Sequence, residues 1–257
     1  MVLLSFDIEE FDMAFEYGKS ISFEDQISIS VTGTTHILNL LAKHQIRATF
    51  FCTVTFAQQA PEIINRITNE GHELASHGYY HSNFKDEHLL MSKQELERLS
   101  GHPVKGYRMA RMMPVDGLEI QKAGYEYNSS INPTWLPGRY NNLKVSRTWF
   151  HEDGVLQLPA SVSPMRFPLF WLSFHNLPLW LYKHLVTRAY HKDQYLNVYF
   201  HPWEFTDLTD QEKYGFPAYV SKNSGQQMVK RMDELMEWIN MQGYASGHIF
   251  EFIQKIK

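Results

Sequence analysis

The chain begins with a short apolar run that ends in a cluster of carboxylates. Residues 2–6 have the character of a buried strand, and four acidic residues follow at once: Asp7, Glu9, Glu10 and Asp12. Unpaired carboxylates are costly to bury, so the cluster indicates a metal ion or a catalytic water network. Catalytic groups of parallel α/β folds gather where strands end. We therefore expect chemistry at Asp7 and Glu9. The competing interpretation is a solvated acidic loop after an edge strand.

The composition favours one globular domain over residues 1–257, because 44% of the residues are hydrophobic and 14% are aromatic. A net charge of −4 without a basic run argues against a nucleic-acid partner. Cys52 is the one cysteine, which excludes a disulfide within the chain. The sequence lacks an apolar run of membrane-spanning length, about 18–20 residues, and a signal-peptide pattern. We expect a soluble, cytoplasmic protein of undefined oligomeric state.

A strand–loop–helix pattern repeats about six or seven times without a linker, which predicts a mostly parallel sheet with outer helices. The expected strands are residues 2–6, 46–53, 72–75, 104–107, 125–128, 155–158 and 195–200. The expected helices are residues 31–44, 61–69, 92–99, 116–122 and 225–241. So many units in this length favour a closed or nearly closed α/β barrel. A doubly wound open sheet is the alternative.

Two histidines follow one of these strands and could bind a metal ion together with Glu9. His77 and His81 are four residues apart, so a helical turn would place both imidazoles on one side. With 13 histidines in the chain such a pair is common by chance, and its position after a strand is the stronger argument. Two histidines, a carboxylate and an open position are typical of catalytic zinc, although cobalt, nickel or manganese would also bind.

Three further residues at strand ends have suitable catalytic chemistry. Asp7 lies two residues before Glu9, so both would point the same way from an extended segment, and Asp7 could act as a general base. Arg108 can hold a carboxylate in an ion pair that keeps it ionised. His201 can protonate a leaving amine.

These segments resemble the motifs of the polysaccharide deacetylase family, also called the NodB homology or carbohydrate esterase 4 family. The similar segments are residues 5–10, 76–81, 106–108 and 197–204. The first and last are closest to the branch with an Asp-x-Glu first motif and a His-Pro-Trp-Glu last motif. The resemblance covers nearly the whole chain in the expected order.

The resemblance implies an α/β fold, a distorted (β/α) barrel of about seven strands, and metal-dependent hydrolysis of a carbon–nitrogen bond. The reaction would remove an N-acetyl group from an N-acetylated sugar or glycan. The implied roles are Asp7 as base, Arg108 as its orienting partner, His201 as acid, and Glu9, His77 and His81 as metal ligands. Glu10 is a rival for Glu9. A backbone N–H at Arg111 would help to hold the oxyanion.

Three departures from the family pattern support an alternative function. Ala110 replaces a proline near the oxyanion donor, and Asn128 stands where an aspartate usually orients the catalytic histidine. We expect the amide oxygen of Asn128 to accept from the His201 imidazole, with less stabilisation than a carboxylate gives. The connection over residues 82–107 is short, which predicts a gap in the barrel wall. The alternative is a weak or inactive barrel that binds a glycan or a metal. A second alternative is a hydrolase of small, non-peptide amides.

Two aromatic features have competing interpretations. Trp203 lies two residues from His201 and is the best candidate for stacking on a sugar ring. Residues 167–182 contain no charge and could form an interfacial membrane helix. Pro168 and Pro178 interrupt this segment, so we favour a helix that covers the barrel or lines a sugar groove. His175 lies outside every motif, and we expect a structural or surface role for it.

Overall fold

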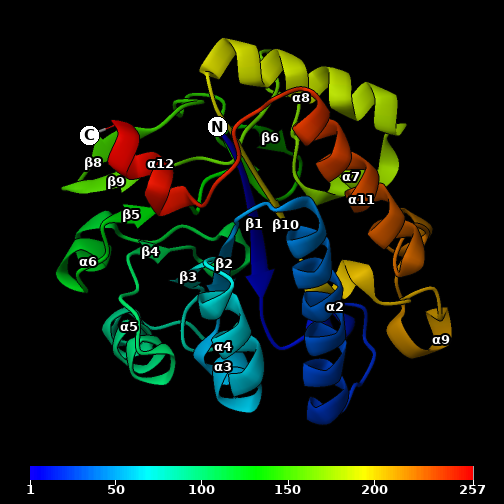
Figure 1. Cartoon of the computed structure of the whole chain (residues 1–257). Coiled ribbons are helices and arrows are strands. Elements are labelled where there is room, and N and C mark those ends of the chain that lie inside the picture. Colours follow the sequence, from blue (N-terminus) through cyan, green and yellow to red (C-terminus); the bar gives the residue numbers. More distant parts are fainter. Residues whose placement is uncertain (257) are drawn as a thin grey trace.

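The computed structural model describes residues 1–256 and shows one curled sheet with helices outside it (Figure 1). The sheet has eight strands in the order β10-β1-β2-β3-β4-β5-β9-β8, and only β8 runs antiparallel to its neighbour. The strands are β1 (Val2–Ile8), β2 (Thr49–Cys52), β3 (Glu73–Ser76), β4 (Gly106–Tyr107), β5 (Tyr127–Asn128), β8 (Phe150–Glu152), β9 (Val155–Gln157) and β10 (Leu196–Phe200). A separate hairpin joins β6 (Trp135–Leu136) to β7 (Tyr140–Asn141).

The segment that follows β9 brings the two sides of the curled sheet together. The Leu158 N–H donates to the Asn128 carbonyl at 2.8 Å, and three residues later the Ser161 N–H donates to the Asn197 carbonyl at 2.7 Å. The segment therefore runs from β5 across to β10, at the other side of the sheet. This closure confirms the distorted barrel predicted from the sequence, and the doubly wound open sheet is wrong.

Helices surround the sheet (Figure 1). They are α1 (Met13–Glu16), α2 (Phe23–His44), α3 (Val54–Gln59), α4 (Pro61–Asn69), α5 (Glu87–Ser100), α6 (Gly117–Lys122), α7 (Trp171–Asn176), α8 (Leu179–Asp193), α9 (Gln211–Tyr214), α10 (Ala218–Ser221), α11 (Gln226–Met241) and α12 (Ile249–Ile256). Two 3-10 turns are η1 (Ala110–Met112) and η2 (Pro202–Phe205). Helix α2 begins eight positions before the predicted start because the Ser22 hydroxyl caps it, accepting from the Asp25 N–H at 3.1 Å.

The residues of β1 alternate between two environments. Leu4 and Phe6 face the helices, whereas Leu3 packs inside the barrel with Ile249 and Ile253 of α12. Helix α12 thus covers the amino end of the barrel, near the start of β1 (Figure 1). The same alternation points Asp7, at the other end of β1, towards the barrel interior.

The barrel wall is continuous where the sequence predicted a gap. Strands β3 and β4 pair directly, with Ser76 opposite Tyr107, and β4 pairs with β5. The short connection still holds the 14-residue helix α5, which is long enough to cover these strands. The predicted gap is therefore wrong.

The uncharged stretch 167–182 covers the barrel as we favoured. It forms α7 and the start of α8, and Phe174 packs against Phe200 of β10 with ring centroids 5.2 Å apart. Trp180 is its main exposed aromatic residue, at 71%. None of the helices in residues 1–256 combines the length and apolar character needed to cross a membrane.

Candidate metal centre and active site

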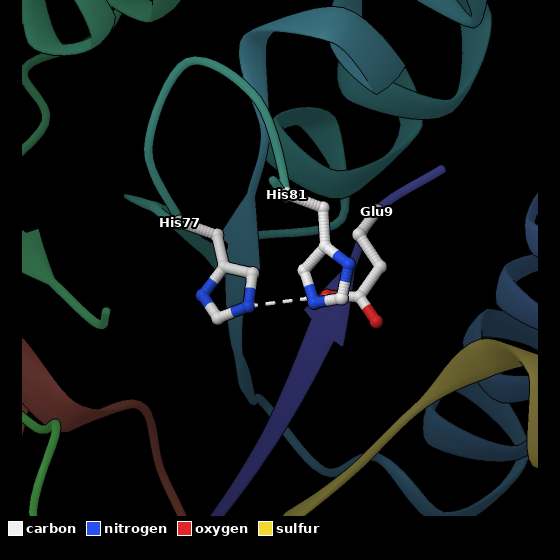
Figure 2. Close-up of side chains that lie close together, drawn as sticks. All are labelled: Glu9, His77 and His81. Carbon is white, nitrogen blue, oxygen red and sulfur yellow. Dashed lines mark ion pairs between the residues drawn. The ribbon is translucent and has the colours of Figure 1, made fainter. Parts of the chain in front are cut away.

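Three predicted metal ligands meet at the carboxyl ends of β1 and β3. The Nε2 atoms of His77 and His81 each lie 3.1 Å from Oε2 of Glu9, and the three side chains face one another (Figure 2). All three ligand atoms fall within 4.8 Å of one another. Oε2 of Glu9 is buried and has no hydrogen-bond partner among the described residues, so neither imidazole is aligned as a donor to it.

The hydrogen bonds of the two imidazoles determine which nitrogen carries the proton. Nδ1 of His77 lies 2.9 Å from the Arg108 carbonyl oxygen, and Nδ1 of His81 lies 2.7 Å from Oδ1 of Asp12. A carbonyl oxygen can only accept, so Nδ1 of His77 is the protonated nitrogen. An ionised carboxylate also only accepts, so Nδ1 of His81, which faces Asp12, is protonated as well. In the neutral rings both Nε2 lone pairs therefore face Glu9, as metal-binding histidines are usually arranged.

This donor set fits a divalent cation. Two Nε2 lone pairs and an ionised oxygen repel one another unless a positive charge lies between them. In the metal-free site a proton can take this place. Burial opposes protonation of His81, but the carboxylates of Glu9 and Asp12 outweigh burial and raise its pKa to about 9. A cation that binds His81 must therefore displace this proton.

The structure favours Glu9 over Glu10 as the carboxylate ligand. Oε1 of Glu10 accepts from the His81 N–H at 2.9 Å, and its Oε2 accepts from the Thr53 hydroxyl at 2.7 Å. Both oxygens of Glu10 are thus occupied, one by the loop that carries His81 and the other by Thr53 at the end of β2. That loop is a series of bends rather than the helical turn we expected. Gly78 takes a positive φ of 94° there, a conformation that suits glycine.

Asp7 and Arg108 form a buried ion pair beside this centre. Nη1 of Arg108 donates to Oδ1 of Asp7 at 2.6 Å and to the Ser5 hydroxyl at 3.0 Å, and Arg108 is fully buried. Burial raises the pKa of Asp7, but Arg108 and the nearby imidazoles of His77 and His201 outweigh it and lower this pKa below its usual value. The structure therefore forms the predicted Asp7–Arg108 contact and keeps Asp7 ionised.

His201 reaches the same site from the end of β10, and its supporting carboxylate is Glu204. Nε2 of His201 lies 4.0 Å from Oδ2 of Asp7, while Nδ1 lies 3.2 Å from Oε1 of Glu204. The His201 N–H also donates to that oxygen, at 2.6 Å. Burial lowers the pKa of His201, but the carboxylates outweigh burial and raise it above the usual value.

Asn128 does not support His201, and this prediction is wrong. Its Nδ2 donates to Oε1 of Gln157 at 2.8 Å, and its Oδ1 accepts from the Ser130 hydroxyl. These bonds tie β5 to β9 and to Ser130, which lies just after β5. Asn128 therefore stabilises the barrel wall.

Trp203 belongs to the cavity lining but presents almost no surface, which argues against the predicted stacking on a sugar ring. It is only 2% exposed and stacks on His201, with ring centroids 5.0 Å apart and planes 20° apart. Its other neighbours are Phe11 and Trp171. Trp203 thus fixes the orientation of the His201 ring.

Arg111 lies at the rim of the site, in the left-handed conformation with φ 57°. Its guanidinium contacts Oδ2 of Asp12 at 3.2 Å and Oε1 of Glu16 at 3.0 Å. The Arg111 side chain is thus paired with Glu16 and with Asp12, the carboxylate that contacts His81. The oxyanion role of its backbone N–H stays a prediction.

One cavity of about 420 Å³ joins the metal ligands, Asp7 and His201. Its outer walls include Met13, Tyr17, Leu136, Tyr140 and Tyr219, from segments without a predicted role. They also include Trp171, from the stretch 167–182 that we expected to cover the barrel or line a sugar groove. Sequence reasoning also missed the supporting roles of Asp12 and Glu204. Both lie in acidic or motif segments that were noted, but only the fold shows which histidine each one contacts.

Comparisons with known proteins agree with this arrangement. The family model described as polysaccharide deacetylase matches residues 18–128, which contain His77, His81 and Arg108 but exclude Asp7 and His201. A peptidoglycan-N-acetylglucosamine deacetylase of Bacillus cereus is 33% identical over 113 residues, 39% of this chain and 40% of the relative. This chain therefore spans well under half the length of that relative.

Solved structures show the same fold at low identity. The allantoinase Puue superposes with a TM-score of 0.64 at 15% identity, over 96% of this chain and 85% of that chain. A carbohydrate esterase 4 family pseudoenzyme of Bacillus anthracis superposes with a TM-score of 0.53 at 15% identity, over 98% of this chain and 64% of that one.

The fold and the site define a curled (β/α) barrel with a two-histidine, one-carboxylate centre at the strand ends. Together with the family match, they confirm the resemblance found in the sequence. Residues 18–128 of the chain match the polysaccharide deacetylase family.

Proposed function

We propose that the chain is a metal-dependent hydrolase that removes an N-acetyl group from an N-acetylated sugar or glycan. The observation that carries the proposal is the convergence of the bare Nε2 atoms of His77 and His81 on the unpartnered Oε2 of Glu9. This donor set lies in one cavity with an ionised carboxylate, Asp7, and an imidazole, His201.

Glu9, His77 and His81 would hold the ion, and zinc is the first candidate for two imidazoles and a carboxylate. Cobalt, nickel or manganese would also suit this set. The ion would supply Lewis-acid chemistry, polarising an amide carbonyl and making a water molecule easier to deprotonate.

Asp7 would act as the general base. Oδ1 is held by Arg108 at 2.6 Å, which leaves Oδ2 on the side of His201 to accept a proton from the attacking water. A carboxylate with a lowered pKa is ionised at neutral pH, as a base must be. Arg108 would keep Asp7 oriented and charged.

His201 would donate a proton to the leaving amine. Its Nδ1–H faces Glu204, so the other nitrogen, Nε2, points to the Asp7 side of the cavity. The raised pKa keeps a larger share of His201 protonated near neutral pH than an unperturbed histidine would have. The backbone N–H of Arg111 is the proposed partner for the oxyanion.

The substrate class is proposed from the family relationship and from the cavity. The Bacillus cereus relative is named for a peptidoglycan N-acetylglucosamine substrate. The cavity offers Tyr140, Trp171 and Tyr219 as candidates for stacking on a sugar, in place of Trp203. The proposal keeps the cytoplasmic location predicted from the sequence.

Acetate release from N-acetylglucosamine oligomers tests this function. We expect turnover by the metal-loaded protein that stops on chelation and returns when the ion is restored. The matched control is the His77→Ala/His81→Ala variant, assayed under the same metal supply. Turnover that is unaffected by chelation would overturn the metal-dependent mechanism.

The same assay separates the two alternatives. Hydrolysis of small cyclic amides without turnover of the sugars would favour the small-amide hydrolase. A bound ion with neither activity would favour a barrel that only binds a glycan or a metal.

A further inference from the structure

A second, fully buried histidine contacts the carboxylate that supports His201. His175 lies on α7, is 0% exposed, and places Nε2 at 3.1 Å from Oε2 of Glu204, which is also 0% exposed. Among the described residues, neither nitrogen of His175 nor Oε2 of Glu204 has an aligned hydrogen-bond partner. From the sequence we expected only a structural or surface role for His175.

The two oxygens of Glu204 have different neighbours. Oε1 accepts from the His201 N–H at 2.6 Å and lies 3.2 Å from Nδ1 of His201. Oε2 faces His175. A buried carboxylate oxygen without a donor is unfavourable, and a small rotation of the His175 ring would align Nε2–H with Oε2. The two groups are therefore best explained as partners.

We propose that His175 is a positioning residue for His201, acting through Glu204, which bridges the two imidazoles. The catalytic meaning of this inference rests on the proposed function, in which His201 is the acid.

The bridge would act on the charge and the orientation of Glu204. Burial raises the pKa of Glu204, but the contacts with His175 and His201 outweigh burial and lower it. An ionised Glu204 stabilises the imidazolium form of His201 and holds its Nδ1–H. Without a donor at Oε2, Glu204 would lose part of its charge stabilisation and would support His201 less well.

Other charged or titratable groups near this bridge must be kept constant in any test. The groups that face His201 or Glu204 are Asp7 at the end of β1, Glu9 in the following loop, His175 on α7 and Tyr182 on α8. Three aromatic rings also enclose His201: Tyr199, Trp171 and Trp203. Replacing His175 alone leaves all the other side chains in place.

The experiment is a titration of the imidazole nitrogens by NMR in the 15N-labelled chain of 257 residues. In the unmodified chain we expect His175 to carry its proton on Nε2. Two donor-free variants of different shape, His175→Phe and His175→Met, should lower the pKa of His201 by about 1, on the order of one charged hydrogen bond. His175→Gln places an amide N–H near the position of Nε2 and should keep the pKa of His201 within about 0.3 of its original value.

An Nδ1–H tautomer of His175 in the unmodified chain would overturn the inference, and this measurement needs no variant. An unchanged His201 titration in a folded donor-free variant would also overturn it. On an active protein, the donor-free variants should lower kcat about tenfold with KM unchanged. Absence of turnover in the unmodified protein would refute the proposed function, whereas the NMR result would still decide the role of His175.

Discussion

The two ends of the barrel each hold a glutamate beside histidines, but only one of these glutamates is satisfied. At the amino end, Oε1 of Glu73 accepts from the Tyr127 hydroxyl at 2.8 Å. Its Oε2 accepts from the Thr49 hydroxyl at 2.7 Å and from the Phe250 N–H at 3.0 Å. His248 lies nearby, with Nδ1 3.5 Å from the same oxygen. Neutral donors thus stabilise Glu73 and tie β2, β3 and α12 together.

At the carboxyl end, Glu9 is buried beside His77 and His81, yet its Oε2 has no aligned donor in the described chain. The Nδ1 atoms of both imidazoles are bound to other groups, which leaves their Nε2 lone pairs directed inward. The difference teaches that a cluster of histidines and a glutamate identifies a metal site only when the inner atoms lack protein partners. Changes at the carboxyl end should affect chemistry, and changes at the amino end should affect stability.

Asp7→Asn should have the largest effect on activity. The amide cannot accept a proton as a general base does, so we expect turnover to fall at least about 10²-fold while metal content stays at the original level. Steady-state kinetics and elemental analysis on the same sample would measure both. Unchanged turnover would remove Asp7 from the mechanism.

At the amino end, His72 should make the folded state sensitive to acid. Its Nδ1 accepts from the Ala48 N–H at 3.2 Å, and burial lowers its pKa to about 4. Since the unfolded chain binds the proton near pH 6.5, stability should be complete above that pH and fall between about 6.5 and 4. The full loss is about 3 kcal/mol, or about 10²-fold in the folding equilibrium.

Urea unfolding across this pH range would measure the effect. His72→Asn is the matched control, because its amide oxygen can accept from the Ala48 N–H without titrating. The same acid dependence in this variant would show that His72 is not its source.

Asp12→Asn should weaken metal binding about 10–100-fold, as expected when the partner of a histidine ligand is changed. Asp12 holds Nδ1 of His81 at 2.7 Å and therefore the orientation of that ring. Glu16→Gln is the control, because Glu16 contacts the same Arg111 guanidinium at 3.0 Å. Metal titration should separate the two variants; equal affinities would contradict the role of Asp12.

Asn128→Ala should have the smallest effect on the chemistry, changing kcat by less than about threefold, because Asn128 does not contact His201. Its lost bonds to Gln157 and Ser130 should appear as a lower free energy of unfolding. A loss of kcat as large as that of Asp7→Asn would restore the role expected from the sequence.

The sequence predicted the parts of the site that follow directly from strand ends. Apolar strands that stop in Asp7, His77, Arg108 and His201 imply a common rim, because parallel strands end on the same side of a barrel. The sequence could not predict the supporting contacts, which depend on how distant segments pack. His175 is on α7, whose short apolar stretch gave no periodic signal, and Glu204 contacts it only because α7 covers the end of β10.

The errors have the same physical origin. The motif position of Asn128 suggested a partner for His201, but a side chain on β5 faces Gln157 on the neighbouring strand β9. Trp203 is near His201 in sequence, and the 3-10 turn of η2 stacks the two rings on each other, so the indole adds almost no exposed surface to the cavity.

Metal content tests the central claim most directly. Elemental analysis of the purified chain and of His77→Ala/His81→Ala should find about one divalent ion per chain in the former and none in the latter. No ion in the unmodified protein after reconstitution, or a full equivalent retained by the double variant, would contradict the assignment of Glu9, His77 and His81 as the metal centre.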